Sequence, residues 1–241
     1  MLGLGNSITY NAPLYDDAFT WEPTDISGLV LWHKNNTDIA VGQWNDSSGN
    51  NNHAVQSTAG NQATIERGGF HFDNSNDFYD YGTQLNIGAS EAYTLAIVYK
   101  LDDINTGNKS TIFSKDANST FFEFFDDDRI RVNYNGSTVT LTASSSLFSA
   151  GSDRIMVTTR STSGAHKVYV NGSDTVVATG TQTGVALWEN LGMRNANPPS
   201  SSGDRPFDGR IYEVMVWDNV EFSGTDLDNL NTYLTNVRNN L

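Results

Sequence analysis

Short apolar segments separated by turn-forming residues run along most of this 241-residue chain, and this alternation restricts the folds open to it. Val, Ile, Phe, Tyr and Thr, which favour strands, dominate the segments. We predict strands at residues 29–32, 69–72, 93–99, 111–113, 120–125, 129–134, 138–141, 154–159, 167–171, 175–178 and 210–217. Asn135-Gly136 and Asn171-Gly172 are typical of two-residue turns that close antiparallel hairpins. Many short strands without intervening helices predict an all-β fold of two antiparallel sheets.

One amphipathic helix is expected at the C-terminal end of the sequence. Its apolar positions recur at spacings of three and four and form a single stripe, at Leu227, Leu230, Leu234, Val237 and Leu241. Ser223 or Thr225 can cap its first turn. We expect this helix to lie over an open edge or end of a sheet.

The charge and composition exclude several classes of function. The formal net charge is −14, with 28 acidic and 14 basic residues, and such a balance repels the phosphates of a nucleic acid. The chain has no cysteine, so disulfides and thiolate chemistry are excluded. No stretch approaches the roughly 18 apolar residues that a membrane-spanning helix needs. The first residues lack the basic and apolar regions of a signal peptide, so synthesis in the cytoplasm is expected.

Four segments carry a family resemblance. Residues 41–54 place Trp44 before the turn-forming run Asp46-Ser-Ser-Gly49, and residues 166–172, 207–217 and 223–234 fit the same pattern. Together they resemble the concanavalin A-like, laminin-G-like jelly-roll domains. The resemblance implies a two-sheet antiparallel jelly-roll sandwich with one short C-terminal helix over residues 25–241. It says little of function, because this fold serves lectins, hydrolases, adhesins and virion proteins.

Residues 1–24 differ from the rest of the chain. Glycines and prolines interrupt any regular period, yet the segment is too apolar for a solvent-exposed tail that makes no contacts. We predict an irregular N-terminal arm that contacts a neighbouring subunit, although it could also pack along its own sandwich. The predicted contact residues are Leu2, Leu4, Ile8, Tyr10, Leu14, Tyr15, Phe19 and Trp21.

A narrower resemblance involves this arm. Residues 1–7, 25–32 and 44–49 together resemble virion structural proteins of tailed phages, notably those that infect marine cyanobacteria. That resemblance implies a non-enzymatic virion component that decorates the capsid or is displayed on a tail or fibre. Its partners would be other virion proteins and further copies of itself.

No catalytic residue is predicted. Glucanases of this fold need carboxylates that face one sugar bond, whereas Glu123 and Asp126 are three residues apart and point to opposite faces of a strand. Asp126, Asp127 and Asp128 fit a hairpin turn better. Glu213 is expected on the same face as Ile211, Met215 and Trp217, buried and satisfied by backbone donors. The four histidines complete neither a catalytic triad nor a metal pair.

Calcium is the metal that the family resemblance suggests. Asp46 and Asn50 lie in one oxygen-rich loop, and Asp73 and Asp77 lie in another. Neither loop has the fixed spacing of an EF-hand, and the same residues also suit ordinary Asx turns.

Carbohydrate binding is the alternative function, in the form of a lectin-like adhesin for a polysaccharide. It needs aromatic rings beside polar loop residues, and residues 78–81 and 188–195 supply both. The candidates are Tyr79, Tyr81, Trp188, Asn190 and Arg194. We expect Trp32, Trp44 and Trp217 to lie in the core instead.

Overall fold

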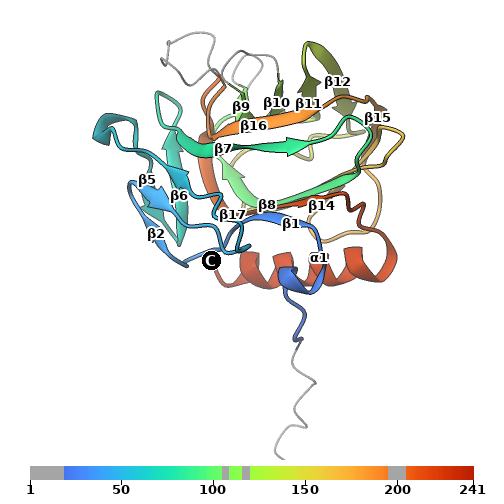
Figure 1. The fold of residues 1–241 in the computed structure, drawn as a ribbon, viewed down its shortest axis with the longest axis horizontal. Helices are drawn as coiled ribbons and strands as arrows, with labels where there is room; N and C mark the ends of the chain where they lie inside the picture. The colour runs from blue at the N-terminus through green and yellow to red at the C-terminus, as the bar shows by residue number, and fades with distance from the viewer. Residues whose placement is uncertain (1–18, 105–108, 116–119, 195–204) are drawn as a thin grey trace, which may run out of the picture.

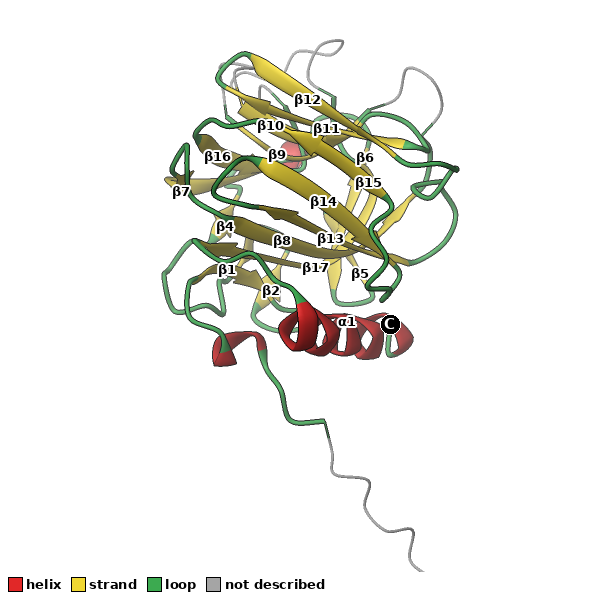
Figure 2. Ribbon diagram, turned by 90° about the vertical axis from the view of Figure 1, so that its right-hand side faces the viewer, coloured by secondary structure: helices red, strands yellow, loops and turns green. Residues whose placement is uncertain are grey.

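A computed structural model describes residues 19–104, 109–115, 120–194 and 205–241. They form two antiparallel β-sheets that pack face to face, with one long helix against the outside of one sheet (Figures 1 and 2). The predicted all-β jelly-roll sandwich with a C-terminal helix is confirmed.

The two sheets are built from strands far apart in the sequence. Among the described residues, the eight-stranded sheet has the order β15-β14-β13-β8-β17-β6-β5, with β1 also paired to β17. Its strands are β1 (Leu29–His33), β5 (Thr64–Glu66), β6 (Gly69–Asp73), β8 (Tyr93–Leu101), β13 (Arg154–Arg160), β14 (Ala165–Val170), β15 (Ala178–Thr181) and β17 (Asp208–Asp218).

The nine-stranded sheet has the order β12-β11-β10-β9-β16-β7-β4-β3-β2 within the same described ranges. Its strands are β2 (Ile39–Ala40), β3 (Gln43–Trp44), β4 (Ala54–Val55), β7 (Tyr79–Ile87), β9 (Ser110–Ser114), β10 (Thr120–Phe124), β11 (Arg129–Tyr134), β12 (Ser137–Thr142) and β16 (Ala186–Leu191). Two short 3₁₀ turns, at Pro23–Asp25 and Ala59–Asn61, complete the connections.

The predicted strands agree with the observed ones to within two residues at either end, except at 175–178. Both residues of Asn135-Gly136 are left-handed and close the β11–β12 hairpin as predicted. Asn171-Gly172 is also left-handed, but it begins a longer loop, so the next strand starts only at Ala178. The prediction failed there because an Asn-Gly pair specifies a turn and not the length of the loop around it.

The space between the sheets is filled mainly by aromatic rings. Trp44, Phe70, Tyr79 and Trp188 are fully buried, and the Phe70 and Tyr79 rings stack with their centroids 4.1 Å apart. Trp188 stacks on Phe113 at 4.9 Å. These rings exclude water from the inner faces and hold the two sheets in register.

A second apolar core lies on the outer face of the eight-stranded sheet. Helix α1 (Gly224–Asn239) packs Leu230 and Leu234 against Trp32 and Trp217 there. The helix therefore covers a sheet face, and the prediction that it lies over an edge or end was wrong. A stripe of leucines shows that a helix buries one side, but it does not show which surface it covers.

A bulge in β17 determines which residues reach the second core. The pairing with β8 shifts between Ile211 and Glu213, so Ile211 faces the inner core while Met215 and Trp217 face α1. Ile211 was expected on the same face as Glu213, and the bulge reverses that expectation.

The carboxylate of Glu213 is completely buried beneath α1. Its Oε1 accepts hydrogen bonds from Trp32 Nε1 and Tyr233 Oη, both at 2.7 Å, and its Oε2 accepts one from Asn35 N at 3.2 Å. The expected burial is confirmed, but side chains supply two of these three donors. Burial raises the pKa of Glu213 to about 7, against the effect of these donors.

No helix among the described residues is long and apolar enough to cross a membrane.

Candidate functional site

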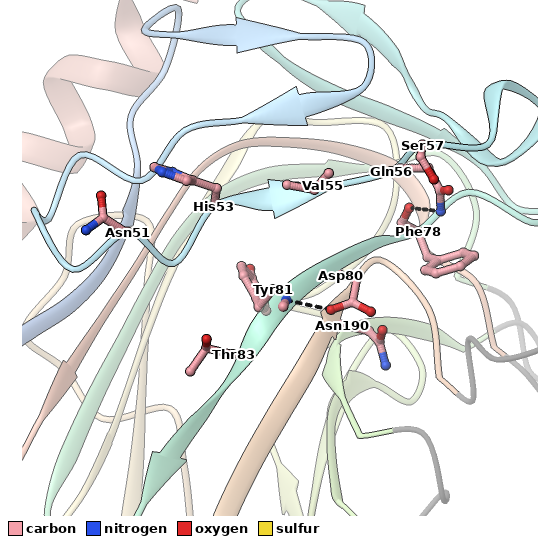
Figure 3. Close-up of a pocket in the computed structure, with 11 residues that line it drawn as sticks. Asn51, His53, Val55, Gln56, Ser57, Phe78, Asp80, Tyr81, Thr83 and Asn190 are labelled. Atoms are coloured by element: carbon pink, nitrogen blue, oxygen red, sulfur yellow. Dashed lines mark hydrogen bonds between the residues drawn. The ribbon is translucent and has the colours of Figure 1, made fainter.

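The outer face of the nine-stranded sheet carries a pocket of about 700 Å³. Its walls come from the loop before β4, from β4 itself, from β7 and from the end of β16 (Figure 3). The side chains that matter most are His53, Gln56, Phe78, Asp80, Tyr81 and Asn190. Helix α1 lies on the other sheet and contributes no residue to this pocket.

Strand pairing places Asp80 at the centre of the site. Asp80 lies opposite Val55 of β4 on one side and opposite Asn190 of β16 on the other. Because successive side chains of a strand alternate, Tyr79 and Tyr81 point into the sandwich while Asp80 points outward. A carboxylate, an amide and an apolar side chain thus lie side by side across three strands.

A bulge in β7 shapes the floor of the pocket. The β16–β7 pairing jumps from Trp188–Leu85 to Asn190–Asp80, so residues 81–84 lie opposite Glu189 alone. The Asp80 carboxylate accepts a hydrogen bond from Gly82 N at 2.6 Å, and Gly82 adopts a φ of 60°. That left-handed turn suits glycine, and it fixes the Asp80 carboxylate at the pocket surface.

Hydrogen bonds also fix the residues around Asp80. His53 Nδ1 accepts from Asp46 N at 3.0 Å, so the proton of a neutral ring resides on Nε2, which is then a donor. Gln56 Nε2 donates to Phe78 O at 3.0 Å, and this bond ties β4 to the start of β7. The ring of Phe78 is half-buried beside it.

Beneath the pocket, Tyr81 and His33 form a stacked pair. Their ring centroids are 5.7 Å apart, and Trp44 stacks on the other side of His33 at 5.2 Å. Burial lowers the pKa of His33 to about 4, so the imidazole is neutral near pH 7. The pocket therefore rests on a rigid, uncharged aromatic layer.

The structure divides the five residues predicted to bind carbohydrate. Tyr81 and Asn190 are among the residues that line the pocket, but both are almost completely buried, with 3% and 2% of their surface exposed. Tyr79 and Trp188 are completely buried in the inner core, which corrects their prediction as surface platforms. Arg194 lies farther along the same face, with its guanidinium 4.0 Å from the Phe121 ring centroid.

His53, Gln56, Phe78 and Asp80 belong to the site but were not among the predicted binding residues. For Phe78 and Asp80 a signal was present, because alternation along residues 78–81 exposes these two once Tyr79 and Tyr81 are assigned to the core. For His53 and Gln56 the sequence offered no signal, because the short strand β4, which lies between these two residues, was not predicted.

The first loop proposed for calcium is already satisfied internally. The Asp46 carboxylate accepts hydrogen bonds from Trp32 N, Asn52 N and both Ser48 N and Ser48 Oγ. The Asn50 amide nitrogen donates to Leu29 O at 2.8 Å. These groups act as a structural Asx turn, and a calcium ion there would have to displace several donors.

The second loop has the same character. Asp77 Oδ2 accepts from Asp73 N at 3.1 Å, and Asp73 Oδ1 accepts from Ser75 N at 3.0 Å. Burial, and to a lesser degree the charge of Asp73, raise the pKa of Asp77 to about 6. Asp73 and Asp77 therefore also form an internally hydrogen-bonded loop, in which a calcium ion would have to displace these backbone donors.

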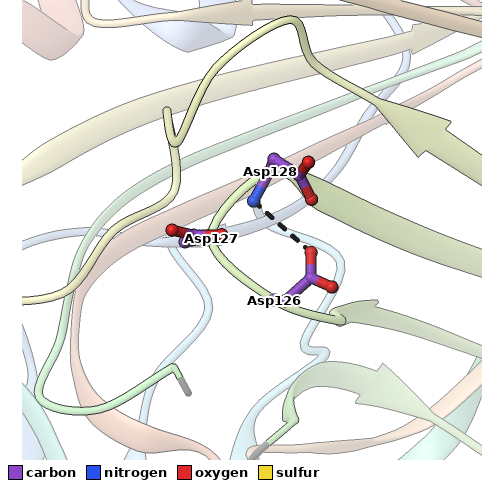
Figure 4. Close-up of side chains that lie close together, drawn as sticks. All are labelled: Asp126, Asp127 and Asp128. Carbon is purple, nitrogen blue, oxygen red and sulfur yellow. Dashed lines mark hydrogen bonds between the residues drawn. The ribbon is translucent and has the colours of Figure 1, made fainter. Parts of the chain in front are cut away.

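Three aspartates do lie close together in the β10–β11 turn (Figure 4). Asp128 N donates to Asp126 Oδ1, and Arg129 Nε donates to Asp126 Oδ2 at 2.7 Å. The guanidinium therefore stands where a cation would bind. The predicted hairpin with an acidic turn is confirmed, and Glu123 lies apart from Asp126 on the strand itself.

Residues 73–222, more than half of the chain, match the family model described as the concanavalin A-like lectin/glucanases superfamily. No curated protein matches the sequence.

Among solved structures, the binding domain of Paraclostridial Mosquitocidal Protein 1 is similar, with a TM-score of 0.59 and 12% identity over 86% of this chain and 52% of that one. The botulinum neurotoxin serotype C1 binding domain has a TM-score of 0.53 and 14% identity over the same shares. A third structure comes from work on botulinum neurotoxin type C, whose cell entry is described as dependent upon interaction with two ganglioside molecules. Its TM-score is 0.54, with 14% identity over 86% of this chain and 51% of that one. The chain spans about half the length of these structures, and at such identities the likeness concerns the fold alone.

Proposed function

Because the chain belongs to the concanavalin A-like lectin/glucanases superfamily, we propose that it is a non-enzymatic carbohydrate-binding domain whose sugar occupies the pocket on the nine-stranded sheet. One observation carries the proposal. The Asp80 carboxylate, held by Gly82, is exposed on the outer face of the sheet, in the same pocket as His53 and Phe78.

The chemistry of the pocket suits a sugar. The exposed carboxylate of Asp80 can accept hydrogen bonds from two hydroxyl groups. The Phe78 ring offers an apolar surface to the C–H face of a pyranose, and His53 Nε2 offers a further donor. The volume lies within the range of small-molecule sites, enough for the end of an oligosaccharide.

The structural neighbours support a binding role by analogy of fold. Two of them are named as binding domains, and the neurotoxin type C structure is described by its interaction with ganglioside molecules. Those are properties of the toxins. The inference that this chain binds a carbohydrate rests on its own pocket.

Binding without hydrolysis is part of the proposal. A glycosidase needs two carboxyl groups free to act on one glycosidic bond. Near Asp80, the carboxylate of Glu189 pairs with Lys115 at 3.3 Å, so it is not free to act as the second group. Incubation of the protein with each bound glycan should release no product. Turnover that disappears in Asp80→Asn or Glu189→Gln would contradict this part.

A glycan array tests the binding proposal directly. The Asp80→Ala substitution should reduce the affinity for the preferred glycan about 10- to 100-fold, the usual loss for a charged hydrogen-bonding group. Asn86→Ala, an exposed change on the same strand outside the pocket, is the matched control and should bind normally. Selective binding that survives Asp80→Ala in a folded protein would overturn the site, and an array with no selective binding would overturn the function.

A second candidate function is the virion component suggested by the N-terminal arm. One observation favours it. Phe19 is exposed next to α1, whereas Trp21 packs edge-on against the domain's own Tyr233 with centroids 6.0 Å apart, as the alternative for the arm expects. The chain thus joins the domain beside the helix and not on the pocketed sheet (Figure 2). The remaining predicted contacts, Leu2, Leu4, Ile8, Tyr10, Leu14 and Tyr15, lie outside the described residues.

Deletion of residues 1–18 tests this second function. The shortened protein should remain folded and bind glycan, but it should no longer be incorporated into virions when it is supplied in trans. Normal incorporation of the shortened protein would contradict an anchoring role for the arm.

A further inference from the structure

Basic side chains gather on the outer face of the nine-stranded sheet, although the whole chain carries a formal charge of −14. At their centre Glu123 of β10 is completely buried opposite Arg131 of β11. Glu123 Oε1 accepts hydrogen bonds from Arg131 Nε at 2.8 Å and from Arg205 Nη1 at 2.6 Å. Arg194 Nη1 lies 3.7 Å from the other oxygen, Oε2.

Among the residues that the structure describes, these cations outnumber the carboxylates that touch them. Three guanidinium groups surround one Glu123, and Lys109 lies nearby with its ammonium 4.3 Å from the Phe125 ring centroid. Asp126, in the turn that follows β10, is held by Arg129. Burial, followed by repulsion from Arg205, lowers the pKa of Arg194 to about 10.

Two aromatic rings hold the guanidinium groups in place. Arg194 stacks over Phe121 at 4.0 Å, and Arg131 stacks over Phe125 at the same distance. Stacking on a ring fixes the plane of a guanidinium and leaves its edge available for paired hydrogen bonds to an oxyanion. The side chains are therefore held in place before any ligand arrives.

Neutralising a buried carboxylate does not explain this arrangement. Glu213 is equally buried in the same protein, and neutral donors from Trp32, Tyr233 and Asn35 satisfy it. Three arginines around Glu123 exceed what burial of one carboxylate requires. Glu123 instead orients Arg131 and Arg205 through shared hydrogen bonds.

We propose that Arg131, Arg194 and Arg205 bind an oxyanion substituent, a carboxylate or a sulfate ester, of the same glycan whose uncharged part occupies the pocket. This inference rests on the proposed function. The two sites share one sheet face, because the paired residues Asp80, Asn190, Ser114 and Phe121 run across four adjacent strands. Three strand spacings amount to about 15 Å, which an oligosaccharide can span. The ligand class is therefore an acidic oligosaccharide.

Matched pairs of glycans provide the test: uronic-acid oligosaccharides with their carboxyl-reduced forms, and sulfated oligosaccharides with their desulfated forms. The full chain should bind at least one acidic member about tenfold more tightly than its neutral partner, the usual value of a charge-assisted contact. The preferred pair identifies the oxyanion as carboxylate or sulfate. The preference should shrink as salt concentration rises.

The Arg194→Gln variant separates this site from the pocket. Arg194 is chosen because Glu123 keeps its bonds to Arg131 and Arg205 when it is changed. The variant should lose the acidic preference and keep the affinity for the neutral member, while the exposed-site control Arg67→Gln should keep both. In parallel, inorganic sulfate should raise the melting temperature of the wild type, relative to chloride at equal ionic strength, more than that of Arg194→Gln.

The outcomes distinguish the two proposals. If neutral and acidic partners bind equally and binding needs Asp80, the pocket stands and the oxyanion site is overturned. An acidic preference of unchanged size in Arg194→Gln, or equal stabilisation of both proteins by sulfate, also overturns it. If no member of any pair binds, the proposed function itself fails.

Discussion

The two sheets of this protein use their outer faces in opposite ways. The outer face of the eight-stranded sheet is covered by α1 and carries a second apolar core with Trp32, Trp217, Leu230 and Leu234. The outer face of the nine-stranded sheet exposes Asp80 and carries the pocket and the largely buried arginine cluster. Each face contains one fully buried glutamate, but Glu213 contacts neutral donors while Glu123 contacts arginines.

Under the proposed function, the contrast separates the residues that stabilise the fold from those that bind the ligand. Burying both faces of one sheet supplies apolar contacts that the sandwich core alone would lack. The other sheet then needs only its inner face for stability, so its outer face can display charged and polar groups. Substitutions on the two outer faces should accordingly affect different measurements.

The largest effect should come from the covered face. Leu230→Ala leaves a cavity between α1 and the sheet, and it should lower the free energy of unfolding by about 2–5 kcal/mol. Denaturant unfolding measures this loss, with Asp80→Ala on the open face as the comparison. Glycan binding by the folded Leu230→Ala protein should be unchanged. A loss of binding equal to that of Asp80→Ala would break the separation of the two faces.

Glu213 should give the covered face a distinctive pH dependence. Its pKa is about 7 in the folded protein, against an ordinary value of 4.5. Between these values the unfolded chain releases a proton that the folded protein retains, so the free energy of unfolding should fall as pH rises from 4.5 to 7.

The Glu213→Gln variant isolates this contribution. It should flatten that part of the profile by about 1–3 kcal/mol relative to the wild type, because the amide does not ionise. Glu189→Gln on the open face is the matched control and should keep the wild-type slope. Parallel profiles for wild type and Glu213→Gln would show that Glu213 does not titrate in this range.

His33, beneath the pocket, should act in the opposite direction. Its pKa is about 4 in the folded protein, against an ordinary 6.5, so the unfolded chain takes up a proton that the folded protein excludes. Stability should therefore fall as pH drops from 6.5 to 4, by an amount comparable to the Glu213 effect or somewhat smaller. His33→Phe, which keeps an aromatic ring between Trp44 and Tyr81, should lose this slope in pH-resolved unfolding. An unaltered slope would contradict the assignment.

The smallest effect should be that of calcium. The carboxylates of Asp46 and Asp77 already accept internal hydrogen bonds, so neither loop offers the ion an open set of ligands. Addition of a chelator or of calcium should leave the melting temperature and the glycan affinity unchanged. A melting temperature that rises with calcium and is restored by chelation would show that one of these loops opens to bind it.

The sequence predicted individual strands and the helix better than it predicted which elements lie next to one another. Strands rich in Val, Ile and Phe, such as β8 and β17, follow from local composition and were predicted. The nine-residue strand β7 was not, because Gly82, Thr83 and Gln84 interrupt its pattern at the bulge that shapes the pocket. Features that make a site are often those that break a local rule.

The two outer faces illustrate the same limit. The leucine stripe of residues 227–241 predicted a helix but could not specify the face that it covers. Arg131, Arg194 and Arg205 are far apart in sequence. The pairing of β10 with β11 brings Arg131 to Glu123, and the folded sandwich brings Arg194 and Arg205, which lie between β16 and β17, to the same carboxylate. Contacts of this kind depend on strand order, which the chain's local pattern does not encode.

Hydrogen exchange of the full chain, with and without the glycan bound most tightly on the array, tests the central claim most directly. Saturation should slow exchange in peptides that contain residues 78–84 and 187–194, and it should leave α1 and β1 unchanged. Protection confined to α1 and the residues that precede β1 would contradict the claim that the open face of the nine-stranded sheet is the binding face.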